Sequence, residues 1–204
     1  KLALISIRGN LANSIVMVVA IGLGVGVCMS MVTVNYLMGK NPIPHKSDQL
    51  FYVQLDNWDP NRPYNDPDEP PDQVTWQDAE GLMEGKRIFR QTKSASFMLV
   101  IRPEDPEIKP FRTIARATHA DFFPMFEVPF LFGNAWPGDM DAVRFAADPV
   151  VVLSRKINDQ LFGGENSVGR DLRLGEHVFR IVGVLDEWKP IPKFYDLTNN
   201  PFGD

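Results

Sequence analysis

Cysteine is almost absent from this sequence: Cys28 is the only one in 204 residues. A single thiol excludes an internal disulfide framework, although it does not fix the compartment, because many extracytoplasmic domains contain no disulfide. An excess of basic residues is also missing, since 21 Lys and Arg stand against 26 Asp and Glu and give a formal net charge of −5. Without a basic stripe bearing interleaved aromatic residues, we do not expect a nucleic acid as partner.

Motifs that carry chemistry are missing as well. The pattern G-x-x-x-x-G-K-[ST] does not occur, because Gly85-Lys86 is followed by Arg87 and lacks the upstream glycine, so this chain should not bind ATP through a P-loop. The histidines lie far apart, without a second ligand at metal spacing. They are His45, His119 and His177. We therefore expect no catalytic residue, no metal site and no cofactor on this chain, and we do not expect it to be an enzyme.

Other candidates for chemistry have structural explanations. Ser154 follows Leu153 rather than standing in a G-x-S-x-G elbow, and helix capping accounts for it. Asp139 and Asp141 could flank a substrate only if the fold supplied a partner, and on sequence alone they are loop residues. The acidic stretch 56–72 invites a calcium site, but it lacks the D-x-[DN]-x-[DN]-G order and a closing Glu. We expect a solvated loop there.

Long apolar runs are equally scarce, and only one reaches membrane length. From Ile15 to Val34 the sequence reads IVMVVAIGLGVGVCMSMVTV, without a charged residue. An α-helix of about 20 residues spans about 30 Å, the thickness of the hydrocarbon core of a bilayer. A buried helix of a soluble core would show an amphipathic stripe, whereas this run is apolar all round. We therefore predict a transmembrane helix over residues 15–38.

Two processed forms compete with a retained membrane helix. A cleaved signal peptide is disfavoured because the run exceeds a normal h-region and is followed by NYLMGKNPIP, without a small-x-small cleavage site. A lipoprotein cysteine at Cys28 is disfavoured because a bulky residue precedes it and because it lies inside the run. Positive charge is nearly balanced, with Lys1 and Arg8 before the helix and Lys40 and Lys46 after it, so charge leaves the orientation open.

Small residues recur inside the predicted membrane helix. Gly22 and Gly26 form a GxxxG pair, with Gly24 and Ser30 nearby. Small side chains four residues apart leave a groove in which a second helix can approach closely, so Gly22 and Gly26 are candidate helix-packing residues. The alternative is that glycine is simply common in membrane helices. The string GLGVGV is not read as a dinucleotide fingerprint, because neither a strand–helix context nor an acidic ribose partner surrounds it.

The remainder of the chain, from about residue 48, has the patterns of a mixed α+β domain. Alternating apolar residues, β-formers and a Thr-Asp capping box predict the following elements. They are a strand over residues 50–55, a helix over 76–84 that is opened by Thr75 and ended by Gly85, and strands over 97–102 and 111–117. The aromatic-rich stretch ADFFPMFEVPFLFG that follows is expected to lie in the core, because clustered Phe mainly buries area.

The last third carries the clearest pattern. Residues 150–153 form an apolar run of strand length, after which Ser154 is placed to cap a helix over 155–162. Gly163 and Gly164 should stop this helix in the usual C-terminal manner. The next residues, ENSVGRDLRLGEHVFRIVGVLD, predict two strands joined by a tight hairpin at Gly175-Glu176. The predicted order is strand, helix, hairpin.

This last segment resembles the periplasmic core domain of MacB/FtsX-type ABC transporter permeases. The resemblance rests on Leu153-Ser154, Leu161-Phe162-Gly163, Asn166, Val168-Gly169 and Val182-Gly183-Val184. The N-terminal NLANSIVMVVAIGLGVGV looks like the family's first membrane helix, whereas residues 56–110 match more weakly. No single motif is specific for the family, but the order and spacing of the motifs together are.

The resemblance implies an organisation and a function. It implies a cytoplasmic stretch over residues 1–14, a membrane helix over 15–38 and a periplasmic core domain over 48–204 that is incomplete at its C-terminus. Such permeases dimerise, as homo- or heterodimers, in the lipid of the bacterial inner membrane. They work with an ABC ATPase that binds the ATP and drives movement of the periplasmic domain. The alternatives are a single-pass anchored interaction module, such as a sensor or scaffold, and a membrane-tethered periplasmic enzyme.

Overall fold

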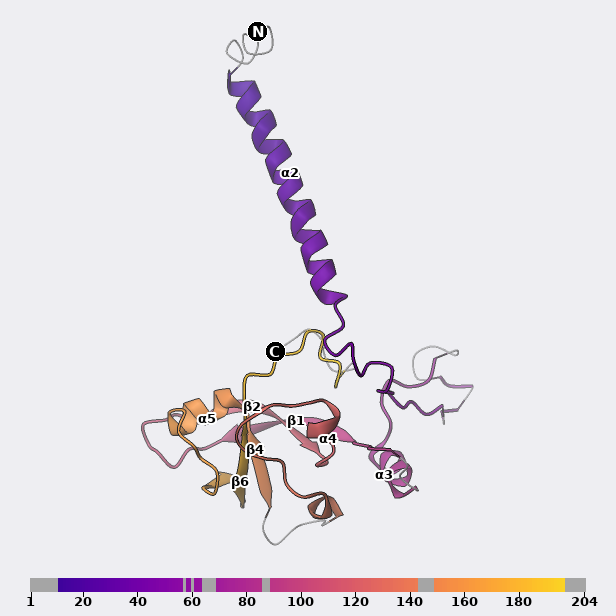
Figure 1. Ribbon diagram of the computed structural model, residues 1–204, viewed down its shortest axis with the longest axis vertical. Helices are drawn as coiled ribbons and strands as arrows, with labels where there is room; N and C mark the ends of the chain where they lie inside the picture. Colours follow the sequence, from indigo (N-terminus) through magenta and orange to yellow (C-terminus); the bar gives the residue numbers. More distant parts are fainter. Residues whose placement is uncertain are drawn as a thin grey trace. The chain divides into compact units, whose positions relative to one another are not determined.

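The computed structural model describes residues 11–56, 58–59, 61–63, 69–85, 89–142 and 149–196 (Figure 1). Contacts within the chain divide the protein into two units, Lys1–Val53 with Pro190–Asp204 and Gln54–Lys189. The first unit holds the long helix α2, and the second holds all the strands of the described chain. The predicted boundaries of the cytoplasmic stretch and of the periplasmic domain stay predictions.

The first unit is dominated by α2, Leu11–Met38, a single helix of 28 residues. It begins four residues before the predicted residue 15 and ends at the predicted residue 38. No side chain of α2 is buried. Among the described residues it is the one helix long and apolar enough to cross a membrane. A core helix of a soluble protein buries its apolar side chains, so that alternative does not fit α2.

The second unit is a mixed α+β domain of short elements. They are α3 (Trp76–Glu84), β1 (Ser94–Ile101), β2 (Phe111–Thr118), α4 (Phe122–Met125), β3 (Phe130–Gly133), the 3₁₀ helix η1 (Gly138–Ala142), β4 (Val150–Leu153), α5 (Arg155–Phe162), β5 (Asp171–Leu174) and β6 (His177–Leu185). The predicted strands over 97–102 and 111–117 are confirmed as β1 and β2. The predicted strand, helix and hairpin of the last third are confirmed as β4, α5 and β5–β6.

The strands form two sheets, and β6 is the centre of the larger one. β6 pairs in parallel with β4 on one side, and antiparallel with β5 and β3. β1 and β2 form a separate antiparallel hairpin. In Figure 1 this hairpin runs across the direction of β4 and β6. The connection between the parallel strands β4 and β6 passes through α5, as a parallel pair requires.

One hydrophobic core joins the two sheets. Ile101 of β1, Leu153 of β4, Leu172 of β5 and Ile181 of β6 form a buried cluster. Partly buried residues of β1, β2, β4, α5 and β5 pack around it, namely Leu99, Phe111, Val151, Ile157, Leu161, Phe162 and Leu174. The β1–β2 hairpin is therefore fixed to the larger sheet by its inner face.

The aromatic stretch after β2 lies partly in the core, since two of its five Phe side chains are buried and the other three are partly buried. Phe122 and Phe123 of α4 are both buried. The ring of Phe123 packs against Phe130 and Trp136, each with its ring centroid 5.2 Å away. The contact with Trp136 is edge-on, with an angle of 88° between the ring planes, and such contacts add to the stabilisation from burial alone.

The cap and the buried polar pair of α5 explain its sharp limits. The hydroxyl of Ser154 accepts a hydrogen bond from the backbone N–H of Ile157, and Gly163 ends the helix in the left-handed conformation, with φ of 62°. Asn158 is fully buried, yet its amide donates to the carbonyl of Glu165 at 2.9 Å and its Oδ1 accepts from the hydroxyl of Ser167. These bonds fasten α5 to the turn that leads into β5.

Gly183 lies where two strands approach too closely for a side chain. A Cβ at this position would lie 2.7 Å from the carbonyl oxygen of Asn134 and 2.8 Å from Cε1 of the Phe130 ring. The Val-Gly-Val motif of β6 therefore has a packing reason, because the glycine makes room for an aromatic ring of β3.

The predicted strand over residues 50–55 is not formed. These residues adopt neither helix nor strand, and Phe51 is 83% exposed. The alternating pattern favours an extended backbone. A β-strand also needs the edge of a second strand, with which its backbone groups can form hydrogen bonds. The described part of the chain does not place such an edge beside this segment.

The helix predicted over residues 76–84 is confirmed as α3, but its apolar face is only partly covered. The Thr75 hydroxyl accepts from the N–H of Asp78 and donates to the Asp78 carboxylate, so the cap differs from the usual capping box. Ala79 is buried, whereas Trp76 and Leu82 are exposed. Lys93 covers part of the exposed Trp76 side chain, since its ammonium lies 3.9 Å from the centre of the indole ring in a cation–π contact.

We expect Gly183→Ala to lower the free energy of unfolding by about 2 kcal/mol, because the added methyl group overpacks the contact between β3 and β6. Urea denaturation of the chain in detergent, followed by tryptophan fluorescence, measures this. Gly81→Ala is the matched control, since nothing lies within 4 Å of its Cβ position in α3, and it should be neutral or slightly stabilising. Equal effects of the two substitutions would contradict the packing argument.

We expect Asn158→Leu to lower the free energy of unfolding by about 3 kcal/mol, because it leaves the Ser167 hydroxyl and the Glu165 carbonyl without this partner in a buried site. Gln160→Leu changes an exposed position two residues along the same helix and should shift stability by no more than about 0.5 kcal/mol. The same denaturation assay compares the two, and an Asn158→Leu protein as stable as the wild type would refute the role of the polar pair.

Candidate functional site

The three histidines lie on different parts of the chain. His45 lies in the first unit, His119 follows β2, and His177 opens β6. The Nδ1 atom of His119 lies 3.4 Å from the carbonyl oxygen of Lys93. Within the described part of the chain, no group of three or more His, Cys, Asp or Glu side chains could hold a metal ion.

The two candidate acidic residues, Asp139 and Asp141, differ in their hydrogen bonds. Both carboxylate oxygens of Asp141 lie 3.0 Å from the N–H of Ala120, and Oδ1 also accepts from Trp136 Nε1 at 2.8 Å. Asp141 thus ties η1 to the entrance of α4 and to an aromatic ring of the core, which is a structural role. Its neighbour Asp139 has no partner among the described residues. The two carboxylates therefore do not act as a pair on a substrate in this arrangement.

The acidic loop that suggested calcium is described only in part, because residues 57, 60 and 64–68 fall outside the described ranges. In the described part, Oδ1 of Asp59 accepts a hydrogen bond from the backbone N–H of Asn61 at 2.9 Å. This is the local turn-forming bond that Asp commonly makes, and it agrees with the predicted solvated loop.

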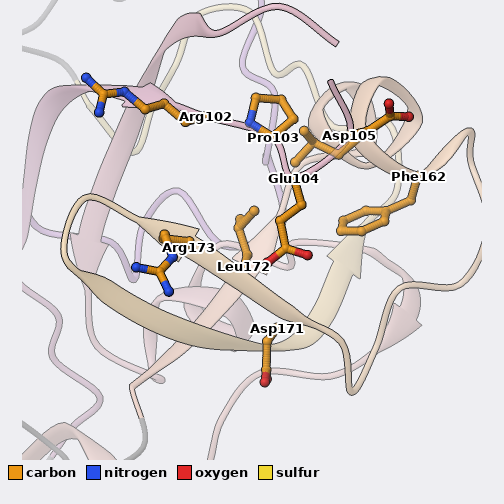
Figure 2. Close-up of a pocket in the computed structure, with 9 residues that line it drawn as sticks. Arg102, Pro103, Glu104, Asp105, Phe162, Asp171, Leu172 and Arg173 are labelled. Carbon is orange, nitrogen blue, oxygen red and sulfur yellow. The ribbon is translucent and has the colours of Figure 1, made fainter. Parts of the chain in front are cut away.

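A hollow of about 210 Å³ lies beside α5 and β5, and no sequence pattern predicts it. Leu172 is buried at its floor, and Phe162 and Leu161 form an apolar side. Figure 2 shows the Glu104 side chain directed toward Leu172, with Arg173 on the other side of that leucine. Its lining also includes Arg102, Pro103, Asp105 and Asp171. No hydroxyl, thiol, imidazole or amine lines the hollow, and its carboxylates are those of Glu104, Asp105 and Asp171.

The candidate helix-packing residues lie on one line of α2. Gly22 and Gly26 are one helical step of four residues apart, and Ser30 continues the line. Nothing lies within 4 Å of a Cβ placed on either glycine. The hydroxyl of Ser30 donates to the carbonyl of Gly26 at 2.9 Å, and the hydroxyl of Thr33 donates to the carbonyl of Met29 at 2.8 Å. No other described group of the chain thus covers Gly22 or Gly26, and the hydroxyl of Ser30 is hydrogen-bonded within the helix.

These features define a class of protein: a long apolar helix without a buried side chain, joined in one chain to a mixed α+β domain. The chain matches the family of the MacB-like periplasmic core domain over residues 14–201, and it belongs to this family. The resemblance inferred from the Leu-Ser, Leu-Phe-Gly and Val-Gly-Val motifs is therefore confirmed. The apolar helix and the periplasmic type of domain indicate a membrane-anchored protein.

Two solved structures are similar to part of the chain. The periplasmic region of MacB from Actinobacillus actinomycetemcomitans is 20% identical, with a TM-score of 0.46 over 56% of this chain and 51% of that chain. The extracellular domain of the noncanonic ABC-type transporter YknZ from Gram-positive bacteria is 17% identical, with a TM-score of 0.45 over 57% of this chain and 59% of that chain. The match thus spans little more than half the length of either structure. No curated protein sequence matches the chain.

We expect replacement of both Gly22 and Gly26 by Leu to weaken association of α2 with a second helix by about 1 kcal/mol, the scale of helix contacts in membranes. This is about a fivefold loss in the association constant. Förster transfer between labelled copies in lipid vesicles measures it. Gly24→Leu is the matched control, because Gly24 lies on another side of the helix. Equal loss from Gly24→Leu would show that this line is not the contact.

Proposed function

We propose that this chain is the anchoring helix and periplasmic domain of an ABC transporter permease, which passes ATP-driven motion from a partner ATPase to that domain. The observation that carries the proposal is the family match, which runs through most of α2 and the whole of the α+β unit. In this proposal the helix and the domain act together as one functional piece. In this proposal the bilayer is the bacterial inner membrane and the domain is periplasmic.

The properties of α2 suit it to transmit motion through a bilayer. Its 28 residues give a length of about 42 Å, which exceeds the hydrocarbon thickness of about 30 Å. It contains no proline, so no backbone hydrogen bond of its interior is lost to a kink. The hydroxyls of Ser30 and Thr33 bond back to their own helix, which satisfies them in lipid. A continuous helix of this kind can carry a displacement from one side of the membrane to the other.

The α+β unit is built to move as a body rather than to react. One buried cluster joins its two sheets, and the buried polar groups of Asn158 and Ser167 bond to each other. The hollow beside α5 is lined by no hydroxyl, thiol or imidazole, and the sequence contains no P-loop. ATP hydrolysis in this proposal therefore belongs to a separate ATPase chain or domain. A second permease copy or a related permease completes the membrane part, in contact with Gly22 and Gly26.

The proposal predicts that ATP turnover by the partner changes the distance between α2 and the domain. The only cysteine, Cys28, is exposed on α2, and Glu176 is exposed in the β5–β6 turn. Spin labels on Cys28 and on Glu176→Cys allow this distance to be measured by pulsed electron resonance, in nanodiscs that hold the full permease and its ATPase. We expect the distance distribution to shift when ATP and vanadate trap the ATPase.

The control for this measurement is an ATPase with its P-loop lysine replaced, which should leave the distribution unchanged. ATP added without the ATPase should also have no effect. If the distance distribution stays unchanged when the ATPase is trapped, in a complex that still hydrolyses ATP, the proposed coupling is wrong. The chain would then fit the alternative of an anchored sensor or scaffold.

A further inference from the structure

The outer face of the β1–β2 hairpin is apolar where a solvated face is expected. Leu99, Ile101 and Phe111 pack into the core, so alternation places Met98 and Val100 of β1 on the opposite face. Met98 stands directly opposite Ile114 in the register of the two strands. Met98 is 68% exposed, Ile114 65% and Val100 45%. Two large apolar side chains in direct cross-strand contact thus face away from the core.

Arginines flank this apolar pair on the same face. Arg112 is opposite Val100 and Arg116 is opposite Ser96, so both point to the side of Met98 and Ile114. The two strands, SASFMLVI and FRTIARAT, contain no Asp or Glu, although the chain has 26 acidic residues. Arg112 makes no ion pair with a described residue, and Arg116 donates to the hydroxyl of Ser94 at 2.9 Å. We name the set Met98, Val100, Arg112, Ile114 and Arg116 the Arg–Met face.

The composition and charge of the Arg–Met face limit what can cover it. Met and Arg are enriched in protein–protein interfaces, where an apolar centre is surrounded by a polar rim. The same face of a second copy is a poor partner, since it would bring arginines against arginines. A partner with carboxylates around an apolar residue complements both features. We propose that the Arg–Met face is a docking surface for a second, acidic protein.

This inference goes beyond the coupling to an ATPase, and its test is read without ATP so that the two can fail separately. The full chain is expressed in cells of its source organism with the photo-cross-linking residue p-benzoylphenylalanine in place of Met98. We expect one discrete protein adduct after irradiation. Mass spectrometry of the adduct should place the cross-link beside Asp or Glu residues of the partner. Raising the salt concentration of isolated membranes before irradiation should reduce the adduct, because the rim charges are screened.

Charge reversal sharpens the test. Arg112→Glu with Arg116→Glu should reduce the adduct about tenfold, because attraction to the partner's carboxylates becomes repulsion. Replacement of those carboxylates by Lys in the partner should restore it. If the double variant is less stable than the wild type in urea, the salt series on the unchanged arginines decides. The matched control carries the photo-cross-linker at Val178, an exposed apolar position of β6, where no charge-dependent adduct is expected.

Several results would overturn the proposal. They are an adduct with phospholipid, an adduct between two copies of this chain, an adduct that ignores both salt and charge reversal, the same adduct from Val178, and no adduct at all. A phospholipid adduct would assign the face to the membrane surface instead.

Discussion

The α+β unit depends on the backbone pairing of β6. β3, β4 and β5 each form their hydrogen bonds with this strand, and its residues Ile181 and Val184 are completely buried. The short flanking strands cannot form a sheet without it, because each is only four residues long and an isolated pair of such strands is marginal in water. The glycine of β6 admits the Phe130 ring, which connects the sheet to the aromatic cluster around α4.

The sequence predicts the last third of the domain well because its local signals agree with its packing. Ser154 caps α5, Gly163 takes the left-handed conformation, and the β5–β6 turn lies at Gly175-Glu176. The apolar run of α2 is equally clear, since its length and its lack of charge need no tertiary context. The match to the MacB-like family agrees with both ends of this pattern.

Features that need a distant partner were not predictable in the same way. The segment 50–55 has the residues of a strand, but only a neighbouring edge could make it one. Asp141 reads as a loop residue because its partners, Ala120 and Trp136, are set by the fold. The Arg–Met face did leave a sign: β1 carries apolar residues at both parities, with Met98 and Val100 alternating with the core residues Leu99 and Ile101. A strand with one covered face needs only one apolar parity.

Ser30 and Thr33 have a mechanical consequence for α2. Because their hydroxyls are already bonded to carbonyls of the same helix, a neighbouring helix seated along Gly22 and Gly26 would be held by close fit rather than by directional bonds. Close fit resists separation of two rods, but it opposes their rotation and sliding far less than interhelical hydrogen bonds would. The contact along Gly22 and Gly26 would then allow α2 to rotate about its own axis while the two helices stay packed together.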